Sequence, residues 1–155
     1  MSEDEKFMKR AIELARLAAQ HSNEPFGAVL VKDGKIVFEN ENSIYTDNDH
    51  TAHAELGLIK KFCKKTGITD LSGYTLYSSC EPCYMCSGAM VWAKLGRLVY
   101  GASDIELSEI LGSNGGECCK DVAKGSFYFP KTTAGVLKEE SLQVLKDYFK
   151  SNKKG

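Results

Sequence analysis

Two short motifs that lie far apart in the sequence carry side chains of the types that bind metals. The first motif contains His53, and the second contains Cys83 and Cys86. One imidazole and two thiolates are ligands that zinc prefers, and three protein ligands leave a fourth position open, as catalytic zinc sites do. The two motifs must therefore meet in the folded chain. We predict a Zn²⁺ site formed by His53, Cys83 and Cys86.

The cysteine pair by itself does not define the type of site. A lone C-x-x-C pair also occurs in structural zinc knuckles and in redox sites. Apart from Cys80, which stands three residues before Cys83, the chain has no further cysteine at C-x-x-C spacing and no H-x-x-x-H pair that would complete a structural site. Cys80 could close the site as a fourth thiolate, or it could be a small buried residue at the end of a strand. Spacing alone does not separate these alternatives.

Glu55 is predicted to be the acid–base group beside the metal. Zinc with two thiolates and a neutral imidazole carries no net charge, so it lowers the pKa of a bound water molecule less than a site with three imidazoles would. A nearby carboxylate that accepts the proton of this water would compensate. Residues two apart do not share a face of a regular helix. His53 and Glu55 can reach one site only where a helix begins. The alternative for Glu55 is a solvated carboxylate that is favourable in the first turn of a helix.

Composition predicts one globular domain, residues 1–155. The chain is 43% hydrophobic and 26% charged, which is ordinary for a folded domain. The formal net charge of −1 gives no general attraction to nucleic acid. We expect a cytoplasmic protein with no membrane segment, because no stretch is apolar enough to span a bilayer and the first residues are charged. Six cysteines without a secretion signal fit a reducing compartment.

Hydrophobic periodicity and turn residues predict alternating helices and strands. Helices are expected at about 3–20, 52–65, 82–94 and 139–150, and strands at about 27–32, 35–40, 74–79, 97–101 and 131–137. Asp33-Gly34 predicts a tight hairpin between the first two strands. A loop is expected around 113–116 and a frayed tail at 151–155. This order puts His53 at the start of one helix and both metal-binding cysteines in the first turn of the next, where helix dipoles favour thiolate.

Between about residues 7 and 102 the chain resembles the cytidine deaminase-like superfamily, whose zinc nucleobase deaminases carry an H-x-E and a P-C-x-x-C motif. Three segments carry the resemblance and look most like guanine and guanosine deaminases: 25–28 (PFGA), 51–55 (TAHAE) and 79–86 (SCEPCYMC). The resemblance implies an α/β fold, a three-layer α/β/α sandwich with a central mixed five-stranded sheet. It also implies a homodimer and hydrolytic replacement of an exocyclic ring amine by oxygen.

The resemblance further implies a small-molecule substrate bound by Asn42, Phe26 and Ala54. A purine base or nucleoside of the guanine type is expected, with release of ammonia. Deamination of adenosine in tRNA and deamination of cytosine or another amino-heterocycle are the alternatives within the superfamily. The tRNA enzymes typically have Leu where this chain has Cys80, and they carry a basic RNA-facing surface. A zinc-stabilised binding module is the alternative outside it.

One departure concerns a second acid. Guanine deaminases of this type carry a Phe-Asp-Asp segment after the fourth strand, where this chain has Gly-Ser-Asn at 112–114. Their aromatic C-terminal tail also has no counterpart in the lysine-rich end of this chain. We therefore expect any second carboxylate to come from Asp104, Glu106 or Glu109, or guanine to be handled poorly.

Overall fold

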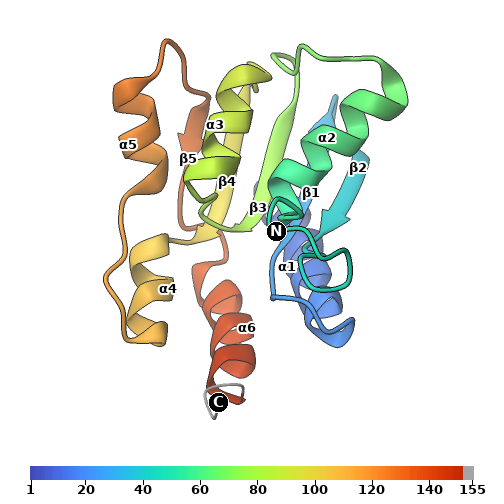
Figure 1. The fold of residues 1–155 in the computed structure, drawn as a ribbon. Coiled ribbons are helices and arrows are strands. Elements are labelled where there is room, and N and C mark those ends of the chain that lie inside the picture. Colours follow the sequence, from blue (N-terminus) through green and yellow to red (C-terminus); the bar gives the residue numbers. More distant parts are fainter. Residues whose placement is uncertain (152–155) are drawn as a thin grey trace.

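The computed structural model describes residues 1–151; of the predicted frayed tail, 152–155 lie outside the described residues. Helices and strands alternate through most of this length (Figure 1). The elements are α1 (Glu3–Gln20), β1 (Gly27–Lys32), β2 (Lys35–Glu41), α2 (Ala54–Thr66), β3 (Thr75–Cys80), α3 (Tyr84–Trp92), β4 (Arg97–Ala102), α4 (Asp104–Leu111), α5 (Cys118–Gly125), β5 (Lys131–Thr133) and α6 (Lys138–Ser151).

The strands form one mixed five-stranded sheet in the order β2-β1-β3-β4-β5, which confirms the expected sheet. β1 pairs antiparallel with both β2 and β3, while β3–β4 and β4–β5 are parallel. The hairpin between β1 and β2 turns at Asp33 and Gly34, which both have positive φ (50° and 73°). Two successive positive φ values are what a type I′ turn requires, so the hairpin prediction is confirmed.

Helices cover both faces of the sheet, as the three-layer prediction requires. Successive side chains of a strand point to opposite faces, and β1 follows this rule. Ala28 and Leu30 belong to a core cluster with residues of α2 and α3, whereas Val29 and Val31 pack with residues of α1. α6 also contacts α1 and β4, α5 contacts α3, and α4 contacts α6 (Figure 1).

The sheet brings two of the predicted substrate residues to the same end. Phe26 directly precedes β1, Asn42 directly follows β2, and the Asn42 N–H donates to the Phe26 carbonyl at 3.0 Å. A Cβ atom added to Gly27 would lie 2.6 Å from the backbone nitrogen of Ala15 in α1. Only glycine therefore lets α1 approach the beginning of β1 this closely.

Several predicted boundaries were wrong, for identifiable reasons. α2 begins at Ala54 rather than Ala52, and α3 begins at Tyr84 rather than Pro82, because the preceding residues His53 and Cys83 have extended backbone (ψ 157° and 177°) and serve as N-caps. α3 also ends two residues earlier than predicted, and β5 has three residues instead of seven.

Two helices of eight residues, α4 and α5, were not predicted. The signal for α4 was present in the sequence as a capping box, in which Ser103 and Glu106 exchange hydrogen bonds of 3.1 and 2.9 Å. α5 has no side-chain cap of its own, so it lacked such a signal. No helix in the described part of the chain is both long and apolar enough to cross a membrane.

Candidate metal centre and substrate cavity

The starts of α2 and α3 bring the three predicted metal ligands together. His53 is the N-cap of α2, Cys83 is the N-cap of α3, and Cys86 lies in the first turn of α3. The ligand atoms of these three residues lie within 4.8 Å of one another, and His53 Nδ1 is 3.5 Å from Cys83 Sγ. Zinc bonds to nitrogen and sulfur at tetrahedral angles place two such ligands about 3.5 Å apart. The donor set and its spacing therefore fit zinc.

Cys80 does not join this group. It is the last residue of β3, its side chain is buried, and it is absent from the cluster of ligand atoms. Burial raises the pKa of the Cys80 thiol well above its usual value, which keeps the thiol protonated. The geometry supports three protein ligands with one position free, rather than a closed structural site.

The electrostatics of the cysteine pair favour a thiolate at Cys83. The pKa of Cys83 is lowered to about 4, first by its hydrogen bond with the Cys86 thiol and then by His53. The Cys86 backbone N–H also points to Cys83 Sγ at 3.5 Å. The same interaction raises the pKa of Cys86, because its thiol is the donor. A metal cation would displace this shared proton and bind both sulfurs.

Glu55 shares the cavity with His53, as expected for two residues at the start of a helix. Because His53 lies outside α2 and Glu55 lies in its first turn, the two side chains reach one cavity without sharing a regular helix face. Glu55 is only 6% exposed. Burial raises its pKa to about 7, and the nearby Cys83 charge acts in the same direction. A solvated carboxylate, the alternative that the sequence left open, is therefore excluded.

The cavity beside the three clustered ligands has a volume of about 170 Å³ and an acidic lining. Its walls are formed by Glu24, Phe26, Asn42, His53, Glu55, Cys80, Glu81, Cys83, Asp104 and Leu107. Four of these residues have carboxyl groups, and none is lysine or arginine. Such a lining offers hydrogen-bond acceptors and repels anions.

The three predicted substrate residues have different positions. Phe26 and Asn42 line the cavity, and the Phe26 ring also contacts Phe149 of α6 at 6.5 Å between centroids. Ala54 does not line it; its side chain is fully buried in the core, and its carbonyl accepts from Asn40 Nδ2 at 2.9 Å. A role of Ala54 in substrate binding stays a prediction.

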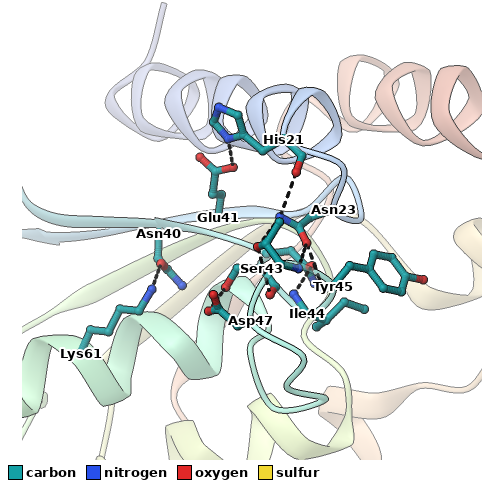
Figure 2. A network of polar contacts seen from close by, with 11 residues as sticks. His21, Asn23, Asn40, Glu41, Ser43, Ile44, Tyr45, Asp47 and Lys61 are labelled. Atoms are coloured by element: carbon teal, nitrogen blue, oxygen red, sulfur yellow. Dashed lines mark hydrogen bonds and ion pairs between the residues drawn. The ribbon is translucent and has the colours of Figure 1, made fainter.

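Asn42 is held at the cavity by the loop that follows β2. Its side chain is 1% exposed, and its Oδ1 accepts from the Ile44 N–H at 3.1 Å, so the amide group has a defined orientation. Asn23, which sequence reasoning missed, shapes the same loop (Figure 2). Its Oδ1 accepts from the backbone N–H groups of Tyr45 and Thr46 at 3.0 and 3.1 Å. This buried asparagine carried no signal in the sequence, because the loop residues that it binds are more than twenty positions away.

Of the three acids considered for a second role, the cavity contains Asp104. Glu106 is used in the cap of α4 and in an ion pair of 3.3 Å with Lys138, and Glu109 is exposed. Glu24 and Glu81 also line the cavity and were not singled out from the sequence. For Glu81 a signal existed, because it stands two residues before the ligand Cys83.

Comparison with known proteins agrees with this site. The family model of the cytidine and deoxycytidylate deaminase zinc-binding region matches residues 1–102. Guanine deaminase from Bacillus subtilis (strain 168) is 46% identical over 106 residues, which cover 68% of this chain and 68% of the relative. The tRNA-specific adenosine deaminase of the same strain is 36% identical over 155 residues, which cover 99% and 93%.

A solved structure from studies of A-to-I editing by tRNA:A34 deaminases has a TM-score of 0.77 at 34% identity, covering 90% of this chain and 98% of that chain. Relatives that are named for a free base and relatives that are named for tRNA therefore both match. The His–Cys–Cys cluster, the mixed sheet and the matched region lead to the same conclusion: this chain belongs to the cytidine and deoxycytidylate deaminase family of zinc-binding deaminases.

Proposed function

We propose that residues 1–155 form a single deaminase domain that hydrolyses the exocyclic amine of a purine base or nucleoside of the guanine type and releases ammonia. The observation that carries this proposal is the cavity lining, which has four carboxyl groups and Asn42 but no lysine or arginine. Guanine presents several N–H donors, which these acceptors can bind. A phosphate group would face like charges in the same cavity. The 46% identity to a guanine deaminase adds support.

In this proposal His53, Cys83 and Cys86 would hold zinc, which would act as a Lewis acid and lower the pKa of a water molecule. Glu55 accepts the proton of that water and delivers it to a ring nitrogen. Once the water oxygen has bonded to the amine-bearing carbon, Glu55 would take the remaining proton of that oxygen and pass it to the amine, so that the C–N bond breaks and ammonia leaves. A carboxyl group whose pKa is raised to about 7 can act as both base and acid near neutral pH. The flat ring of the base stacks on the aromatic ring of Phe26, and the amide group of Asn42 forms hydrogen bonds with the edge of the base.

The test is a screen for ammonia release from guanine, guanosine, adenosine, cytosine and a tRNA anticodon stem-loop by the zinc-loaded protein. We expect turnover of guanine or guanosine. Robust activity on cytosine or on the stem-loop, with no turnover of the free purines, would contradict the proposal.

Deamination of adenosine in tRNA is the second candidate. The observation that favours it is coverage, since the tRNA-specific relative of Bacillus subtilis matches 99% of this chain. An RNA-editing enzyme binds RNA with an affinity that falls steeply as salt increases. A gel-shift titration with the stem-loop at low and high salt would separate the candidates, and we expect no shift.

We also propose that the protein is a homodimer that works in the reducing cytoplasm, where its six cysteines form no disulfides. α3 has no charged residue, and Tyr84, Met85 and Trp92 on it are exposed, Trp92 by 81%. The Trp92 ring contacts the exposed Phe127 with 5.9 Å between centroids. An exposed apolar surface of this kind is typical of an interface, and a second copy is the partner that the family resemblance implies.

Replacing Trp92 with Glu is expected to give a monomer, because a charge would be buried in the interface. Light scattering after size-exclusion chromatography measures the mass. Ile68→Glu is the control, since Ile68 is also exposed (39%) but lies outside α3. A dimeric Trp92→Glu protein would exclude this surface.

Asn42→Ala is expected to lower kcat/KM by roughly 5- to 150-fold, the effect of about 1–3 kcal/mol from one lost hydrogen-bonding group. Steady-state kinetics measure it, and thermal unfolding shows whether the loop after β2 stays folded. Asn114→Ala is the matched control, because Asn114 is exposed and does not line the cavity. An unchanged kcat/KM for Asn42→Ala would remove Asn42 from the substrate site.

A further inference from the structure

Glu81 connects the metal-binding loop to two helices that are distant in sequence. Its Oε1 accepts from the Asp104 N–H at 3.0 Å, and its Oε2 accepts from the Cys119 N–H at 3.1 Å. Its own backbone N–H donates to the Ala102 carbonyl at the end of β4, at 2.7 Å. One residue, two positions before the ligand Cys83, therefore has hydrogen bonds to three later segments of the chain.

The two side-chain contacts are made to helix N-termini, which need acceptors. The first N–H groups of a helix have no partner within the helix, and a negative charge there is favourable. Asp104 is the first residue of α4, and Cys119 is the second residue of α5. α4 has its own capping box, but the N-cap of α5, Glu117, makes no side-chain cap. Glu81 supplies to α5 the acceptor that its local sequence lacks.

These contacts fix one wall of the substrate cavity. Asp104 lines that cavity, and its Oδ2 accepts from the Gly116 N–H at 2.9 Å. The beginnings of both helices, and the loop between them, are thus tied to one carboxylate. A larger cavity of about 370 Å³ is lined by Glu81 and Cys119 among others. α5 packs against α3, but this space is not filled by side chains, so on this side of α5 close packing would not replace the carboxylate if it were lost.

We infer that Glu81 is a positioning residue: its carboxylate holds the N-termini of α4 and α5 so that Asp104 stays in the wall of the substrate cavity. The inference rests on the proposed function only where substrate kinetics are used. It predicts that loss of one acceptor oxygen loosens the wall and weakens substrate binding more than it slows the chemical step.

Glu81→Gln is the test, since glutamine keeps the shape but has one acceptor oxygen, so its NH₂ group must face one of the two N–H donors. We expect wild-type zinc content and faster amide hydrogen exchange at the starts of α4 and α5, by about tenfold or more. KM for guanine should rise by about tenfold, with kcat changed by less than about threefold.

Glu109→Gln is the matched control, because it makes the same change on the exposed side of α4 and should leave exchange and KM as in the wild type. If Glu81→Gln does not fold, Glu81→Asp, whose side chain is too short to keep both contacts, is measured in the same way and should show the same changes to a smaller degree. A lower melting temperature with unchanged exchange at both helix starts and unchanged KM would overturn the inference. Absence of guanine turnover in the wild type would instead contradict the proposed function, and hydrogen exchange would still decide the role of Glu81.

Discussion

Replacing Glu55 with Gln is expected to lower kcat by two to four orders of magnitude, the usual contribution of a positioned acid–base group. Glutamine has nearly the same shape, but it can neither accept the proton of water nor deliver one to the ring. The Glu55 side chain is 6% exposed, so bulk water cannot readily replace it as a proton carrier. Steady-state ammonia release with guanine or guanosine measures the loss.

Zinc content and melting temperature of Glu55→Gln should stay close to the wild type, because Glu55 is not one of the three clustered ligands. Glu140→Gln, the same change on an exposed residue of α6, serves as the control. Near-normal turnover by Glu55→Gln would show that another group moves the protons. Asp104 would then be the first residue to examine, since it lines the same cavity.

Replacing Cys83 with Ala is expected to abolish stoichiometric zinc binding, and activity with it. Two protein ligands remain in that variant, whereas zinc sites in proteins use at least three. Cys83 also caps α3, since its sulfur is the acceptor for the Cys86 N–H at 3.5 Å, so some loss of stability is expected. Elemental analysis gives the zinc content, and circular dichroism shows whether the fold is retained.

A second variant separates metal binding from capping. Cys86→Ala removes a ligand without removing the cap of α3, and it should lose zinc as well. Cys63→Ala is the control, because Cys63 lies in α2 and is not one of the three clustered metal ligands. Stoichiometric zinc in Cys83→Ala would bring back Cys80 as a ligand. Complete unfolding after removal of zinc from the wild type would favour a zinc-stabilised binding module over an enzyme.

Features that depend on neighbouring residues could be predicted from the sequence. The Asp33-Gly34 turn is formed as expected, and Ser2 and Glu5, which stand at the spacing of a capping box, form one at the start of α1. Each of them is made by residues at most three positions apart, so the pattern itself contains the interaction. The three clustered metal ligands were predicted for a related reason, because their side-chain chemistry alone required them to meet.

The wall of the cavity could be decided only by the tertiary structure. Glu81 is bound to residues 23 and 38 positions away, and Asn23 shapes a loop that begins after β2. Which backbone N–H groups meet a given side chain depends on how α4 and α5 pack after β4, and no local pattern encodes this. The sequence by itself predicted the metal ligands and the carboxylate near them, because side-chain chemistry limits what three such ligands and one carboxylate can do. Tertiary packing decided which other carboxyl groups line the cavity, because those contacts join segments that are far apart in the sequence and that no local pattern connects.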